Sequence, residues 1–161
     1  MELDDQLQHP PRSEAASALA TLIAASRRRL WLRVPILDDL TAATSVCDAL
    51  KALALSSPRA DIRILFDDAG SAVRDGHRLI HLARRLPSRL TLKQTQDDDR
   101  DDQQCHAIAD GTGLFEACGW PRPIRLDLSS QRLPRAPQLA RQFLQLWERA
   151  GGNTELRELR L

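Results

Sequence analysis

The sequence predicts a single α/β domain with three layers, in which a mostly parallel mixed sheet is flanked by helices. One observation is that stretches with apolar residues at helical spacing alternate with short apolar or β-branched runs. The other is the length of 161 residues, which suits one domain and allows a sizeable core. We expect residues 13–150 to form this domain, with a flexible N-terminal tail over residues 1–12 and a C-terminal tail over residues 151–161.

The first half of the domain is predicted to contain three helix–strand pairs. Apolar side chains recur every three or four positions in the predicted helices, which cover residues 13–29, 44–56 and 71–86. Each is followed by a short apolar or alternating run, and the strands predicted from these runs cover residues 30–34, 61–66 and 89–93. Pro35 should end the first strand, because proline cannot donate to a strand ladder. The order of elements favours parallel strands joined by right-handed crossovers.

The second half is predicted to add three strands and a closing helix. Residues 94–102 contain five aspartates and are expected to form a solvated loop. The strands that follow are predicted over residues 105–109, 114–117 and 124–128, with a tight turn at Asp110 and Gly111 between the first two. The last helix should begin near Pro137 and pack an apolar stripe against the core. This stripe consists of Leu139, Phe143, Leu146, Trp147 and Ala150.

Composition excludes several classes of protein. The formal net charge is +1, so there is no general attraction to nucleic acid or to an anionic membrane surface. No apolar run is long enough to span a bilayer, and the first residues lack a signal-peptide pattern. The three cysteines, Cys47, Cys105 and Cys118, form no C-x-x-C pair. We therefore expect a cytoplasmic protein without membrane insertion, metal or cofactor.

Several segments together resemble one half of the phospholipase D superfamily. These are helices leading into 30–32 and 61–66, the stretch Gly76–Leu79, the strand-turn-strand around Asp110 and the closing Phe143–Trp147. Residues 76–88 are similar, more narrowly, to a small uncharacterised bacterial family of degenerate phospholipase D-like domains. Some members of that family sit beside GNAT-type acetyltransferase domains. Because halves of this superfamily pack face to face, the resemblance implies a homodimer or a partner protein domain.

The catalytic motif of the superfamily, H-x-K-x-x-x-x-D, is absent from the sequence. If Asp110 holds the Asp position, Gln103 holds the position of the nucleophilic His and Cys105 that of the Lys. If His106 is taken as the motif His instead, Ile108 and Gly113 hold the other two positions. Neither register supplies the chemistry, so we expect no enzymatic activity and a structural role for Asp110 in the turn.

Two other arrangements are weak candidates for chemistry. His77 and His81 are four residues apart, as in the zinc motif H-E-x-x-H, but Arg78 takes the place of the Glu. Cys105 precedes His106, but neighbours on a strand point to opposite faces. We therefore assign no catalytic or metal-binding residue.

Positive charge gathers along the third predicted helix. The residues that form this basic face are Arg74, His77, Arg78, His81 and Arg85. One interpretation is a solvated surface whose arginines pair with Asp67, Asp68 or Asp75. The other is a binding site for the phosphate groups of nucleic acid, a nucleotide or an anionic lipid headgroup, because the guanidinium fork suits phosphate.

The sequence thus favours an interaction module, a catalytically inactive phospholipase D-like protein that binds itself or a protein partner. Phosphate binding through the basic face is the alternative. Salt distinguishes the two, because phosphate contacts weaken steeply as salt rises, whereas an apolar interface changes little.

Overall fold

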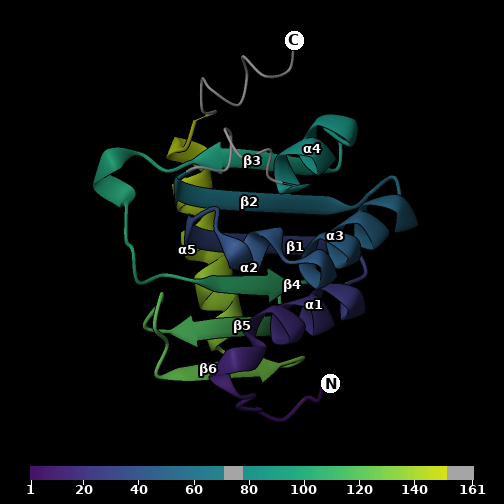
Figure 1. Cartoon of the computed structure of the whole chain (residues 1–161), viewed down its shortest axis with the longest axis vertical. Coiled ribbons are helices and arrows are strands. Elements are labelled where there is room, and N and C mark those ends of the chain that lie inside the picture. The colour runs from purple at the N-terminus through teal and green to yellow at the C-terminus, as the bar shows by residue number, and fades with distance from the viewer. Residues whose placement is uncertain (71–77, 152–161) are drawn as a thin grey trace.

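Six strands form one mixed sheet in the order β3-β2-β1-β4-β5-β6 (Figure 1). The structure is a computed structural model and describes residues 1–70 and 78–151. The strands are β1 (Arg29–Ile36), β2 (Asp61–Asp68), β3 (Leu90–Gln94), β4 (His106–Ala109), β5 (Gly113–Cys118) and β6 (Arg125–Ser129). β1, β2 and β3 are parallel to one another. β4 pairs antiparallel with β1, β5 pairs antiparallel with β4, and β6 pairs antiparallel with β5. The predicted α/β fold class is confirmed.

Helices cover both faces of the sheet and complete three layers (Figure 1). The α-helices are α1 (Ala15–Ala25), α2 (Asp39–Ala42), α3 (Thr44–Ser56), α4 (Arg78–Arg85) and α5 (Arg135–Arg149). Two short 3-10 helices are η1 (Arg12–Glu14) and η2 (Asp97–Asp99). α5 crosses one face alone, and α1 to α4 lie on the other. Among the described helices, none is both long and apolar enough to pass through a bilayer.

The central strand β1 is buried on both faces, which explains its nearly continuous apolar sequence. Leu30, Leu32 and Val34 enter the main core beneath α1 and α3. Trp31 points the other way and stacks on Phe143 of α5, with ring centroids 5.4 Å apart. Phe143 stacks in turn on Trp147 at 5.6 Å. The apolar stripe predicted for the last helix therefore does pack against the sheet.

Four local features differ from the sequence prediction. β1 continues through Pro35 to Ile36, which is possible because the pairing of β1 with β4 ends at Arg33 and leaves Pro35 outside that ladder. The first helix ends at Ala25, before the arginine run. The short helix α2 was missed; the Asp38 side chain caps it by accepting from the Leu40 amide at 3.1 Å.

The N-terminal segment is the fourth difference, because it lies along β6 rather than extending as a flexible tail. Gln8 and Leu128 exchange two backbone hydrogen bonds, of 2.8 and 2.9 Å. The amide of Ser130 also donates to the carbonyl of Asp4 at 2.8 Å. Residues 152–161 lie outside the described part of the chain.

Candidate functional site

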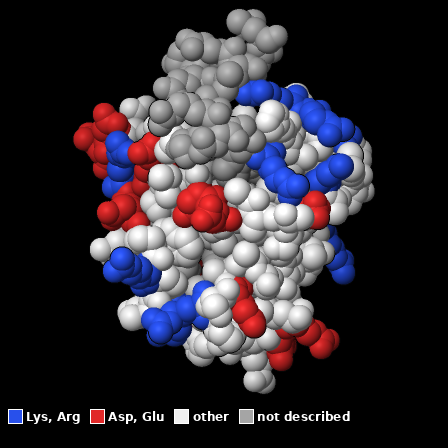
Figure 2. Space-filling model, viewed as in Figure 1, with Lys and Arg blue, Asp and Glu red and all other residues white. Residues whose placement is uncertain are grey.

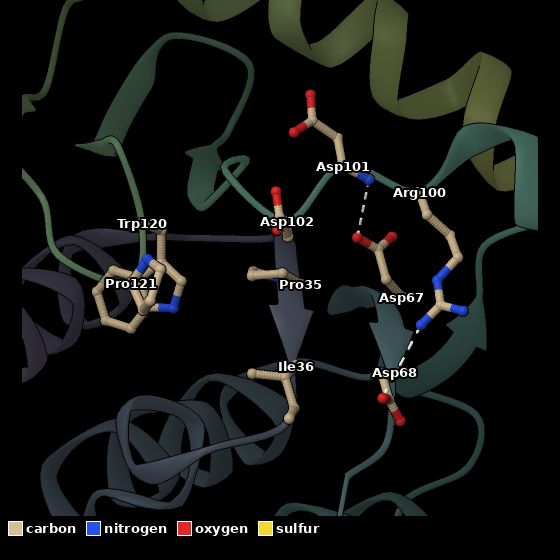
Figure 3. Close-up of a pocket in the computed structure, with 9 residues that line it drawn as sticks. All are labelled: Pro35, Ile36, Asp67, Asp68, Arg100, Asp101, Asp102, Trp120 and Pro121. Atoms are coloured by element: carbon tan, nitrogen blue, oxygen red, sulfur yellow. Dashed lines mark hydrogen bonds and ion pairs between the residues drawn. The ribbon is translucent and has the colours of Figure 1, made fainter.

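Strand ends from both halves of the chain meet at one edge of the sheet. β1 and β2 are parallel and end there, and the antiparallel β4 begins there, so that Arg33 near the end of β1 lies opposite His106. In parallel α/β sheets, ligands generally bind beyond this carboxyl edge. A cleft of about 630 Å³ opens at this position (Figure 3), which we call the carboxyl-edge cleft. Its lining residues are Pro35, Ile36, Asp67, Asp68, Arg100, Asp101, Asp102, Trp120 and Pro121.

The cleft is acidic on one side and aromatic on the other. Four aspartates line it against a single arginine, Arg100. Within the described residues, the one ion pair of Arg100 is a long contact of 3.9 Å with the exposed Asp68. Trp120 and Pro121, from the segment after β5, stand across the cleft from these charges (Figure 3). Its lining therefore has an excess of negative charge.

Asp67 is the buried anchor of the cleft, with 4% of its surface exposed. Its carboxylate accepts hydrogen bonds from Thr95 Oγ1 at 2.7 Å, from the amide of Asp101 at 3.0 Å and from Arg33 Nη2 at 3.3 Å. Because both carboxylate oxygens accept hydrogen bonds and Arg33 supplies the opposite charge, the buried charge is balanced and the loop before β4 is fixed to β2. Asp67 thus holds the acidic loop in place.

The positions assigned to the lost motif carry no exposed nucleophile. Gln103 is exposed, but its amide is a poor nucleophile. Cys105 lies in the main core, where burial raises the pKa of its thiol. His106 points to the opposite face, toward α5, as strand alternation predicts. Burial and the charges of Arg33 and Arg135 lower the pKa of His106 to about 3, so its imidazole is neutral.

Asp110 has the structural role that the sequence predicted. It follows β4 with φ of 51°, in the left-handed region. Its carboxylate accepts hydrogen bonds from three consecutive backbone amides, those of Arg27, Arg28 and Arg29. The side chain therefore holds the connection from α1 to β1 and takes no part in the cleft.

Comparison with known proteins places this architecture in a family. The model of the DUF7931 domain of unknown function matches residues 11–159. The chain belongs to this family. No curated protein sequence matches it.

Solved structures with the same fold include members of the phospholipase D family. The DUF7931 domain is similar to Nuc, a phospholipase D family member from Salmonella typhimurium, with a TM-score of 0.63 and 13% identity over 90% of this chain and 94% of that one. It is also similar to NucT from Helicobacter pylori, with a TM-score of 0.58 and 15% identity over 92% and 98% of the two chains. TrmBL2, an archaeal chromatin protein, matches with a TM-score of 0.62 and 13% identity over 92% of this chain and 53% of its own. At these identities the likeness establishes a phospholipase D-like fold.

The predicted basic face is only partly within the described residues of the DUF7931 domain. Arg78, His81 and Arg85 lie exposed on α4, and Figure 2 shows positive charge on that side of the molecule. Arg74 and His77 lie outside the described residues. Among the described residues, Asp67 pairs with Arg33 and Asp68 with Arg100, and neither pairs with an arginine of α4. The expected partner Asp75 lies outside the described residues.

A second polar cluster was not anticipated from the sequence. One atom each of Glu116, Cys118 and Asp127 lies within 4.8 Å of the others, a geometry compatible with a metal ion. However, Arg135 binds both oxygens of Glu116, at 3.2 and 2.7 Å, and Arg125 binds Asp127 at 2.8 Å. These guanidinium groups neutralise both carboxylates, so the cluster fits an ion-pair network better than a metal site.

Sequence patterns contain little signal for the groups that position the cleft. Arg33 and Asp67 are buried charges within strands whose other buried positions are mostly apolar, and they lie 34 positions apart. Charges that interrupt a buried strand at an inward position are the signal that could have found them, since such groups are rarely buried without a partner.

Proposed function

We propose that this DUF7931 domain is a protein-interaction module that does not hydrolyse phosphodiesters, and that its carboxyl-edge cleft binds a basic segment of a protein partner. The observation that carries the proposal is the charge of the cleft, where four aspartates face one arginine. A lysine or arginine side chain entering the cleft would meet carboxylates on one wall and the Trp120 ring on the other.

The same charge opposes binding of a phosphodiester. Phosphoryl transfer needs a nucleophile together with cationic groups that stabilise the developing negative charge. The acidic lining would repel a phosphate group, and like charges brought together at an interface cost several kcal/mol. The buried Cys105 and the exposed amide of Gln103 further support loss of the phosphohistidine mechanism.

Trp120 adds specificity for a cation beyond simple charge attraction. The half-buried indole offers a face to a cationic side chain, an interaction worth about 0.5–2 kcal/mol. Exposed carboxylates such as Asp68 and Asp102 accept from a guanidinium fork. A partner segment with arginine therefore fits better than one with isolated apolar anchors.

Peptide binding tests the proposal. We would titrate the protein with a fluorescent Arg-Ser repeat peptide and with a Glu-Ser repeat peptide of equal length. Binding of the Arg-Ser peptide that weakens as salt rises is expected. The double variant Asp68→Asn/Asp102→Asn should weaken it by about 5- to 30-fold, if each lost charge pair contributes about 0.5–1 kcal/mol.

A matched variant distinguishes peptide binding in the cleft from attraction of the peptide to negative charge elsewhere on the surface. Asp97 and Asp98 are exposed on the loop that also carries Asp102, but they do not line the cleft. The double variant Asp97→Asn/Asp98→Asn therefore makes the same change in charge outside the cleft. This control should leave peptide affinity within about twofold of wild type. Equal weakening by both double variants would contradict a cleft-specific role.

Catalytic inactivity needs its own assay. The purified protein should give no turnover of bis(p-nitrophenyl) phosphate or of single-stranded and duplex DNA above the buffer blank. Turnover that remains constant through purification and is lost in a His106→Phe variant would overturn this part of the proposal and leave peptide binding to be judged separately.

Self-association is the other form that an interaction module can take. A second copy would bring its exposed α4 arginines to the acidic cleft, since opposite charges occur on one chain. Light scattering after size exclusion would then show a dimer or larger assembly at low salt that dissociates at high salt. A monomer under both conditions would favour a different protein as partner.

Phosphate binding through α4 remains a second candidate, favoured by one observation. Within the described part of the chain, no carboxylate forms an ion pair with Arg78 or Arg85, and Arg78 donates only to Thr44 Oγ1 at 2.8 Å. A salt-sensitive thermal shift with oligonucleotides or anionic headgroups, lost in Arg78→Ala/Arg85→Ala, would support this candidate. No shift with either probe would count against it.

A further inference from the structure

A smaller pocket lies beneath the acidic loop, between the sheet and α5. Its volume is about 170 Å³. Arg33 and His106, neighbours across β1 and β4, line its inner end, while Phe143 and Leu146 of α5 supply an apolar wall. Asp99 and Asp101 line it from the loop. We call this space the inner pocket.

Two residues that line the inner pocket each have a buried nitrogen atom without a hydrogen-bond partner among the described residues. These atoms are Arg33 Nη1 and His106 Nδ1, on residues that are 2% and 3% exposed. Buried polar atoms in folded proteins are almost always hydrogen bonded, so each exception calls for an explanation. Two such atoms, on residues of adjacent strands that both line the inner pocket, indicate a polar group that binds there.

The charges around the inner pocket determine the chemistry of that group. Asp67 balances the charge of Arg33, and Arg149 binds Asp99 through two contacts of 3.0 Å. The carboxylate of Asp101 is exposed and makes no ion pair among the described residues. At its inner end the pocket therefore offers an N–H of Arg33 and, in the tautomer protonated at Nδ1, an N–H of His106. At the loop it offers the Asp101 carboxylate.

A ligand that matches both ends carries an anionic and a cationic group a few atoms apart. We propose that the inner pocket binds a small free α-amino acid. Its carboxylate accepts from Arg33 Nη1 and from His106, and its ammonium group faces Asp101. The volume admits glycine, alanine or serine and excludes a nucleotide or a phospholipid headgroup with its chains. This proposal differs from peptide binding in the carboxyl-edge cleft, although Asp101 lines both spaces.

Calorimetric titration with defined probes tests the match to a zwitterion. Glycine, L-alanine and L-serine should bind and raise the melting temperature at saturating concentration by several degrees. Acetate and methylammonium, which each carry one of the two charges, should bind at least about tenfold more weakly, because each lacks one of the two sets of contacts. Inorganic phosphate should give no shift.

Substitution of the pocket residues gives a second test. His106→Phe removes the unpartnered nitrogen and keeps an aromatic ring, so the fold should tolerate it, while amino-acid affinity should fall by about tenfold or more. The same substitution at the exposed His81, outside the pocket, should leave affinity unchanged. If His106→Phe fails to fold, the exposed Asp101→Asn should still weaken amino acids while leaving the affinity for acetate unchanged.

The outcomes that overturn the proposal are distinct. Absence of a shift with every amino acid means that the inner pocket holds only water. A phosphate response stronger than the glycine response means an anion site instead. Equal affinities for glycine in wild-type protein and in both pocket variants would show that the ligand binds elsewhere. Failure of the peptide experiment at the cleft would leave all these measurements unaffected, because Asp68 and Asp102 do not line the inner pocket.

Discussion

The Asp110 carboxylate accepts a hydrogen bond from the backbone amide of Arg29 at 2.9 Å. The same side chain accepts from the amides of Arg27 and Arg28, at 2.8 and 3.0 Å. One residue in the turn between β4 and β5 therefore fixes the start of the central strand, which lies 81 positions earlier in the chain. The aspartate at the position assigned to the superfamily motif thus has a role independent of catalysis.

Asp110→Ala should lower the free energy of unfolding by about 1.5–3 kcal/mol, because three amides lose a charged acceptor. Asp110→Asn should cost less, since asparagine keeps a carbonyl oxygen and tolerates the left-handed conformation. Urea denaturation of both variants measures the difference. A loss below about 0.5 kcal/mol for Asp110→Ala would show that these hydrogen bonds contribute little.

Rebuilding the motif with Gln103→His/Cys105→Lys should not produce phosphodiesterase activity. Cys105 is 1% exposed and lies in the main core, so a lysine there would bring an ammonium group into an apolar environment. We expect the double variant to unfold or to lose several kcal/mol of stability. The single variant Gln103→His, at an exposed site, is the control and should stay folded. Activity in a stably folded double variant would contradict the placement of Cys105.

Stability should fall on acidification below pH 6.5 because of His106. Its pKa is lowered from 6.5 to about 3 in the folded protein, so between these values the unfolded chain binds a proton that the folded chain does not. The unfolding free energy then decreases as pH falls, by up to about 1.4 kcal/mol per pH unit, and this contribution is constant above pH 6.5. Denaturation of wild type and His106→Phe at pH 7 and pH 5 isolates the effect. Parallel losses in both proteins would assign the acid sensitivity to other groups.

Trp147→Ala should destabilise the fold by about 3–5 kcal/mol, because it removes a buried indole that stacks on Phe143. Lys93 and Arg63 also lie over its ring, at 4.7 and 5.5 Å from the centroid. Leu144→Ala, on the exposed side of α5, should cost less than about 1 kcal/mol. Similar losses for both substitutions would mean that the helix packs with little preference between its faces.

Arg78→Ala/Arg85→Ala should leave the stability within about 1 kcal/mol of wild type. Both side chains are exposed on α4, and contacts between exposed groups contribute little. Thermal denaturation is a sufficient measurement, with the buried Leu79→Ala as a destabilising reference. Clear unfolding of the double variant would show that α4 depends on its arginines.

The layers of the fold could be predicted from the sequence, because burial imposes periodic patterns. Phe143 and Trp147 follow the helical period and do face the sheet, and the alternation in β1 separates Leu32 from Trp31. The prediction that Pro35 ends the first strand was wrong, because proline interrupts a strand only where the strands on both sides pair with it, and β4 does not pair with β1 at Pro35.

The candidate sites could not be predicted in the same way, because their residues meet only through the sheet register. Arg33 meets His106 through pairing of β1 with β4, and Trp120 reaches the cleft from beyond β5. The five aspartates after β3 were expected to be solvated, yet the loop that carries them is fixed by the Asp101 amide, which donates to Asp67. Local pattern can mark a charge within a buried strand, but it does not identify the residue that the charge contacts.

Both outer strands of the sheet are paired with terminal segments. Gln8 pairs with Leu128 of β6, and Gly151 exchanges hydrogen bonds of 2.7 and 3.0 Å with Gln94 of β3. A free outer strand is the usual template for β-augmentation and for aggregation, and here each one has part of its backbone already engaged. For the proposed protein partner, these segments reduce the outer-strand backbone open to pairing, so recognition would rely more on side-chain chemistry, at charged and aromatic positions that can change without altering the sheet.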